Sequence, residues 1–173
     1  MHRIQRILLL ACFVVLLSQA AVTAAPMNVS DMGISRFTYA VDQLGSQQGI
    51  QTHFANYMRL TPSGDKIGPY DVYPLDYSDG SHRVLILYLT HDASYIERIS
   101  VLWPVDDETS MNNAGDLVDL MLGIIGLTKA EGDALASQGN DASVWCTSAN
   151  RRIHLHLSKS DEVYDATITS EDS

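Results

Sequence analysis

The fold is decided by residues 83–126, which begin with the apolar sequence Arg83-Val84-Leu85-Ile86-Leu87-Tyr88-Leu89-Thr90. A continuous apolar run of this length predicts a strand that is buried on both faces and is therefore central in a sheet. A second strand, residues 95–103, follows after a short turn and alternates between apolar and polar side chains. The most apolar helix after the N-terminal segment is then predicted over residues 111–125, and Gly126 ends it.

The residues before this unit predict one helix and two more strands. Residues 31–44 have apolar side chains at helical spacing, and residues 52–60 alternate as a strand does. Residues 71–77 also alternate, but Pro74 cannot donate a ladder hydrogen bond, so we expect this strand at a sheet edge or at a bulge. The turn at residues 78–81 then joins it to the central strand as a hairpin.

The residues after this unit predict a short helix and three strands. Thr128 and Glu131 form a capping box at the start of the helix, which we expect to end near Ser137. The three strands are predicted at residues 142–147, 151–158 and 162–168. Links of hairpin length imply antiparallel pairing. The sequence therefore predicts an α+β domain, with about seven antiparallel strands in the order α-ββββ-αα-βββ and helices packed on one face of the sheet.

The first 24 residues have the features of a signal peptide. Arg3 and Arg6 precede an apolar run, residues 7–17, which is too short to span a membrane. Val22-Thr23-Ala24 fits the rule for a cleavage site, and a second possible site follows Ala20. We therefore expect a periplasmic or secreted protein with no stable membrane insertion after cleavage. The mature chain, residues 25–173, is predicted to be a single domain with a frayed polar C-terminus.

The charge of the chain narrows the choice of partner. The full sequence has 11 Lys and Arg against 21 Asp and Glu, and removing Arg3 and Arg6 changes the net charge from -10 to -12. Such an acidic protein without a basic cluster is a poor candidate for binding nucleic acid or an anionic membrane. One interpretation of this charge is a basic protein partner, and the competing interpretation is that the charge serves only to keep the protein soluble. Cys146 is the single cysteine after residue 24, so the mature chain has no internal disulfide, although Cys146 could pair with another chain.

Two histidines are candidates for a metal site. His154 and His156 flank Leu155 on a predicted strand, so both imidazoles project from the same face. Two imidazoles at this spacing can share a zinc ion, but a tight site needs a third or fourth ligand. The candidates for that ligand are His53, His82, His91 and Asp165. The competing interpretation is the polar, half-exposed face of an amphipathic strand.

Three tyrosines are candidates for a binding surface. Tyr70, Tyr73 and Tyr77 lie on or beside the strand that we expect at an edge of the sheet. Tyrosine suits an interface because it combines a large apolar ring with a polar tip. The competing interpretation is a sheet face padded by aromatic side chains beneath the helices.

No catalytic motif stands out in the sequence, so we expect a small exported binding protein that is not an enzyme. A protein partner is our first choice, with a role as an inhibitor or as an immunity-type neutraliser of a basic toxin or enzyme. One alternative is a metal-binding protein or metal-dependent enzyme that uses His154 and His156. Another is a small-molecule-binding module with a pocket between the sheet and the helical hairpin.

Overall fold

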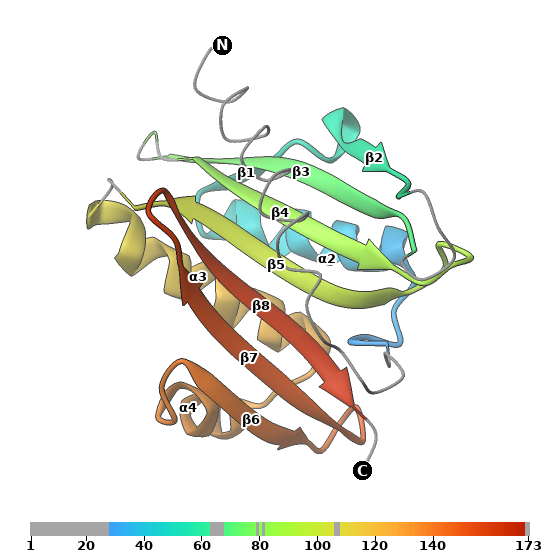
Figure 1. Ribbon diagram of the computed structural model, residues 1–173, viewed down its shortest axis with the longest axis vertical. Coiled ribbons are helices and arrows are strands. Elements are labelled where there is room, and N and C mark those ends of the chain that lie inside the picture. The colour runs from blue at the N-terminus through green and yellow to red at the C-terminus, as the bar shows by residue number, and fades with distance from the viewer. Residues whose placement is uncertain (1–27, 63–67, 79, 81, 106–107, 172–173) are drawn as a thin grey trace.

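The structure, a computed structural model, describes residues 28–62, 68–78, 80, 82–105 and 108–171. The predicted signal peptide and residues 172–173 of the predicted frayed end lie outside the described residues. The elements, in chain order, are α2 (Ile34–Gln47), β1 (Ile50–Thr52), the 3-10 helix η1 (Phe54–Asn56), β2 (Met58–Leu60), β3 (Tyr70–Tyr77), β4 (His82–Leu89), β5 (Ile96–Pro104), α3 (Glu108–Ile125), α4 (Lys129–Ala136), β6 (Asp141–Cys146), β7 (Arg151–Lys159) and β8 (Val163–Glu171). The predicted α+β class is confirmed (Figure 1).

All eight described strands belong to one antiparallel sheet. Its strand order is β1-β3-β4-β5-β8-β7-β6, and β2 pairs with β3 beside β1. β4 lies inside this order, and every residue from Arg83 to Leu89 is buried. The predicted central position of the apolar strand is therefore confirmed. The last three strands join the sheet through β8, which lies between β5 and β7.

The single strand expected at residues 52–60 is wrong. The chain forms β1, turns through η1 and forms β2, and both strands pair with the same side of β3. The expectation that β3 is an edge strand is therefore also wrong. Pro74 explains the break: its carbonyl accepts a hydrogen bond from the His53 N–H, so its ring nitrogen, which has no hydrogen, faces the gap between β1 and β2. This break gives eight strands in place of about seven.

The first helix lies three residues later than expected because the preceding residues make other contacts. α2 spans Ile34–Gln47, whereas the spacing predicted residues 31–44. Ser30 forms a bridge to Ile96 of β5, and Asp31 pairs with Arg151 at the start of β7. These long-range contacts hold the residues that we expected at the helix start in a non-helical segment.

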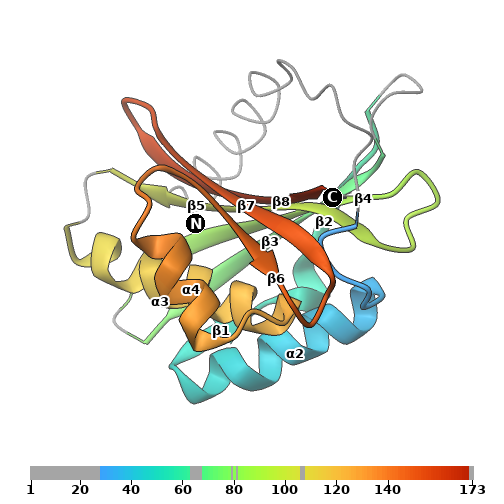
Figure 2. The same ribbon diagram turned by 90° about the horizontal axis from the view of Figure 1, so that it is seen from below.

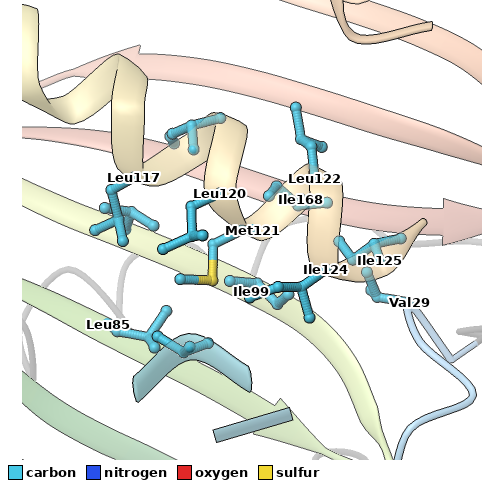
Figure 3. Packing of buried hydrophobic residues seen from close by; sticks show 14 of the residues in the cluster. Val29, Leu85, Ile99, Leu117, Leu120, Met121, Leu122, Ile124, Ile125 and Ile168 are labelled. Carbon is cyan, nitrogen blue, oxygen red and sulfur yellow. The ribbon is translucent and has the colours of Figure 1, made fainter. Parts of the chain in front are cut away.

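The three described helices cover only one face of the sheet, which we call the first face (Figure 2). Phe37 of α2 and Leu135 of α4 are fully buried there, together with the apolar stripe of α3 that points at β4 and β5 (Figure 3). The buried α3 residues are Leu117, Val118, Leu120, Met121, Leu122, Ile124 and Ile125. Burying a side chain of this size stabilises the fold by about 1.5–3 kcal/mol. None of the helices in the described part of the chain is long and apolar enough to cross a membrane.

The opposite side of the sheet, which we call the second face, has a smaller apolar cluster. Its buried members are Tyr70, Val72, Val84, Ile86, Tyr88, Leu102 and Val163. Most of them come from β3 and β4, where side chains alternate between the two faces. Polar side chains dominate the rest of the second face.

The segment that precedes α2 is fixed by a buried arginine. Arg151 is only 4% exposed, and its guanidinium donates to the Asn28 carbonyl and to Asp31. The Ser170 hydroxyl donates to the same carbonyl of Asn28 at 3.0 Å. Val29 is fully buried, and its N–H donates to the Ile96 carbonyl at 2.7 Å. We call this set of contacts the Arg151 clasp.

Candidate functional site

The second face presents its side chains in rows that run across the strands. One row is Tyr70, Tyr88, Arg98, Thr169, His154 and Ser143, and the next is Val72, Ile86, Ser100, Thr167, His156 and Asp141. Each row begins with apolar or aromatic side chains on β3 and β4 and becomes polar from β5 onward. The polar part, from β5 across β8 and β7 to β6, is therefore a continuous surface built on rigid strands.

His154 and His156 lie on the second face, each beside a different carboxylate. His154 Nε2 lies 3.0 Å from Glu171 Oε1 on β8. His156 Nδ1 forms a hydrogen bond with Asp141 on β6. Arg152 precedes them on the same face, with its Nε 4.0 Å from Glu171 Oε1. The two imidazoles are thus engaged separately, one toward each neighbouring strand.

The predicted third ligands for zinc lie in three different places. His91 is in the exposed turn between β4 and β5, and His53 and His82 lie at the far corner of the second face. Asp165 accepts a hydrogen bond from Thr167 at 3.2 Å. Among the residues that the structure describes, no group of three or more His, Cys, Asp or Glu side chains is placed to hold a metal ion.

Two other histidines share one carboxylate at that far corner. His53 Nε2 lies 2.7 Å from Asp76 Oδ2, and His82 Nδ1 lies 2.5 Å from Asp76 Oδ1. The three side chains are 36%, 38% and 31% exposed for His53, His82 and Asp76 respectively. Partial burial works to raise the pKa of Asp76, but the hydrogen bonds and charges of the two imidazoles outweigh it and hold this pKa below its ordinary value.

The centre of the second face contains an arginine, an aromatic ring and a carboxylate. The Arg98 guanidinium carbon lies 3.5 Å from the centroid of the Tyr88 ring, which is a cation–π contact. Burial raises the pKa of Asp165, and the hydrogen bond from Thr167 and the charge of Arg98 offset only part of this effect. Arg98 therefore links the apolar and the polar parts of the face.

The three predicted tyrosines do not form one surface. Tyr70 lies on the second face, where its ring centroid is 5.5 Å from that of Tyr88. Tyr73 and Tyr77 lie an odd number of residues from Tyr70 along β3, so their side chains point to the opposite side, which is the first face. Tyr73 is buried, and Tyr77 lies beneath the Arg83 guanidinium, whose carbon is 5.1 Å from the ring centroid. The competing interpretation, aromatic padding of a sheet face, describes Tyr73 and Tyr77.

A neighbouring aromatic side chain reaches solvent instead. Tyr57 is 46% exposed, and its ring stacks on Tyr73 with the centroids 5.5 Å apart. Arg59 makes two hydrogen bonds of 2.7 Å to buried Asp71, which also accepts one from the Tyr73 hydroxyl. Because β2 was predicted only as part of a longer strand, the sequence did not show that Tyr57 would sit at a break.

The comparisons with known proteins identify no family. No family model matches the chain, and no curated protein and no solved structure matches it at a significant level. The function must therefore be argued from the geometry and the charge of the second face.

The carboxylates beside the histidines were not predicted from the sequence. Asp141 and Glu171 lie just outside the predicted strands, because β6 starts one residue earlier and β8 ends three residues later than expected. Asp76 lies directly opposite His82 in the hairpin of β3 and β4. The alternation of side chains in that predicted hairpin could have shown that Asp76 and His82 face each other. The contact of His53 with Asp76 could not be predicted, because it depends on the turn of the chain at η1.

Proposed function

We propose that the protein is a small exported binding protein whose second face recognises a basic protein partner. The observation that carries the proposal is the difference between the two sides of the sheet. The described helices cover the first face (Figure 2), while the second face presents ordered rows of polar and charged side chains. Side chains held on strands lose little entropy when a partner binds, so such a surface is suited to recognition.

The charge of the second face supports a basic partner. Its carboxylates among the described residues are Asp76, Asp141, Asp165 and Glu171. Its arginines are Arg98 and Arg152, so the face has a net charge of 2 - 4 = -2 when its histidines are neutral. The predicted mature chain has a net charge of -12, and this charge produces a long-range electric field that attracts cations. An inhibitor or an immunity-type neutraliser of a basic toxin or enzyme would act in this way.

Affinity capture with matched charge variants tests the proposal. The mature protein would be immobilised and exposed to the exported fraction at low salt. The double variant Asp141→Asn/Glu171→Gln removes two carboxylates from the second face. The control, Asp116→Asn/Asp119→Asn, removes the same charge from the exposed side of α3 on the first face. We expect the control to retain a basic partner and the second-face variant to lose at least ten-fold in apparent affinity.

The ionic strength provides a second readout. A partner held by charge should elute as salt shortens the Debye length from about 30 Å at 0.01 M to about 8 Å at 0.15 M. Equal losses in the two double variants would show that net charge, and not the second face, governs binding. Retention of no basic protein by the unsubstituted chain would refute the proposed function.

A further inference from the structure

Four of the five histidines in the described residues lie on the second face, and each lies beside a carboxylate of that face. Three of them form a hydrogen bond with it, whereas His154 Nε2 only approaches Glu171. The pairs are His53 with Asp76, His82 with Asp76, His154 with Glu171, and His156 with Asp141. The fifth, His91, is in the exposed turn between β4 and β5. Three of the four carboxylates of this face, all except Asp165, thus lie beside an imidazole.

We propose that the second face binds its basic partner at neutral pH and releases it in mild acid, because the protonated histidines then neutralise the carboxylates that the partner needs. This inference rests on the proposed function and adds its regulation. Histidine is the side chain that ordinarily changes charge between pH 5 and 8. Protonation of all four imidazoles changes the net charge of the face from -2 to -2 + 4 = +2.

The mechanism is a competition for the same oxygens. A neutral imidazole donates one hydrogen bond to its carboxylate and leaves the negative charge uncompensated. A protonated imidazole at the same distance forms an ion pair, as at the 3.0 Å separation of His154 Nε2 and Glu171 Oε1. A lysine or arginine of the partner must then displace an internal cation. The partner therefore loses the attraction of each carboxylate, and it also faces a surface whose net charge is no longer negative.

The other charged groups around the imidazoles allow this change. The surroundings are Asp76 for His53 and His82, Glu171 and Arg152 for His154, and Asp141 and Asp165 for His156. Arginine side chains ordinarily stay charged throughout this pH range. Asp165 strengthens the effect, because burial raises its pKa and it loses negative charge earlier on acidification. Arg152 lies beside the same Glu171 oxygen as His154, so that carboxylate is already shared with a fixed positive charge.

The size of the effect follows from proton linkage. If a histidine must be neutral in the complex, its protonation weakens binding by up to about ten-fold for each pH unit below the pH at which that histidine titrates. Two such histidines would weaken binding up to about one hundred-fold per pH unit. We therefore expect the dissociation constant to rise at least ten-fold between pH 7.5 and pH 5.5.

The experiment uses immobilised poly-L-lysine as the cationic probe, since lysine stays charged at both pH values. Binding of the mature protein is measured at pH 7.5 and pH 5.5 at constant ionic strength. The variant with His53, His82, His154 and His156 replaced by Gln should bind almost equally at both pH values. His91→Gln, the matched control, should retain the full pH dependence, and circular dichroism at both pH values verifies folding.

The outcomes separate the two proposals. If the unsubstituted protein binds the probe at pH 7.5 no better than Asp141→Asn/Glu171→Gln, the proposed function fails. If it binds through these carboxylates at pH 7.5 and equally well at pH 5.5, only the pH inference fails. If the variant with four histidines replaced does not fold, the imidazole proton resonances of the unsubstituted protein can be followed by NMR as a function of pH instead. Imidazoles of the second face that stay neutral at pH 5.5 would also overturn the inference.

Discussion

Asp76 is a single carboxylate whose ionised form is stabilised by two ring N–H donors. His53 comes from the segment between β1 and η1, and His82 from the start of β4, so Asp76 fastens three parts of the chain. Because its pKa is depressed in the folded state, Asp76 stabilises the fold above its ordinary pKa near 3.8. That stabilisation is lost as the pH falls through the lower folded value.

Asp76→Asn should therefore change the stability in a pH-dependent way. At pH 6 we expect a loss of about 1 kcal/mol in the free energy of unfolding, kept small because the side chain is partly exposed to solvent. As the pH falls through the lowered pKa of Asp76, the difference from the unsubstituted protein should narrow, since the aspartate then loses its charge and resembles asparagine. Urea unfolding at pH 6 and at progressively lower pH values measures this change. Asp161→Asn, in an exposed turn, should have little effect, and a pH-independent loss in Asp76→Asn would contradict the expectation.

At the scale of the element, two glycines at the C-terminal end of α3 must respond to alanine in opposite ways. Gly123 is exposed, and a Cβ placed on it meets no heavy atom within 4 Å. Gly126 ends the helix with a φ of +113°, and a Cβ there would lie 2.4 Å from Ser148 Oγ. Ser148 donates to the Gly126 carbonyl at 2.6 Å, so its hydroxyl is not free to move away.

Gly123→Ala should stabilise the protein by about 0.5–1 kcal/mol, because alanine restricts the unfolded chain and favours the helix. Gly126→Ala should destabilise it by about 1–3 kcal/mol through strain at a positive φ and the collision with Ser148. Thermal and urea unfolding of the two variants measure both changes. Each variant is the control for the other, because both replace glycine with alanine at sites three residues apart. Stability changes of the same sign would refute this description of the end of α3.

The elements also show what could be predicted from the sequence. β4 and α3 were predicted correctly because a continuous apolar run and a helical apolar stripe are local signals. The break between β1 and β2 was missed because it arises where two short strands pair beside Pro74, which depends on β3 being their common neighbour. The histidine–carboxylate pairs were missed for the same reason: Glu171 and Asp141 meet His154 and His156 only after β6, β7 and β8 have paired.

At the scale of the whole molecule, one sheet connects the first and the last parts of the chain. β6 is held by β7 on one side, and on the other side the Gln138 amide bonds both the N–H and the carbonyl of Ser143 at 3.1 and 3.0 Å. Cys146 at the end of β6 is fully buried in the core that the first face shares with α2 and α3. β6 should therefore open only when that core opens.

Labelling of Cys146 by a thiol reagent should consequently report global unfolding. We expect the free energy of opening from labelling rates to equal the free energy of unfolding from tryptophan fluorescence. In the absence of urea, labelling should be slowed by a factor of about 10³–10⁸ relative to an unfolded thiol. Ser137→Cys places a thiol at the exposed end of α4 and should label at once. Labelling of Cys146 well below the fluorescence transition would show that β6 opens separately.

The Arg151 clasp also fixes an order of events as the polypeptide is made. Asn28 lies 123 residues before Arg151 and 142 residues before Ser170, yet both side chains donate to its carbonyl. A chain that emerges with its N-terminus first must therefore leave the Asn28 carbonyl without both donors until its last two strands have emerged. The closing of so large a loop adds little to the entropic cost, because that cost grows only with the logarithm of loop length. The contacts of Asn28 are thus completed only at the end of synthesis, and a chain that stops before β8 lacks the bond from Ser170.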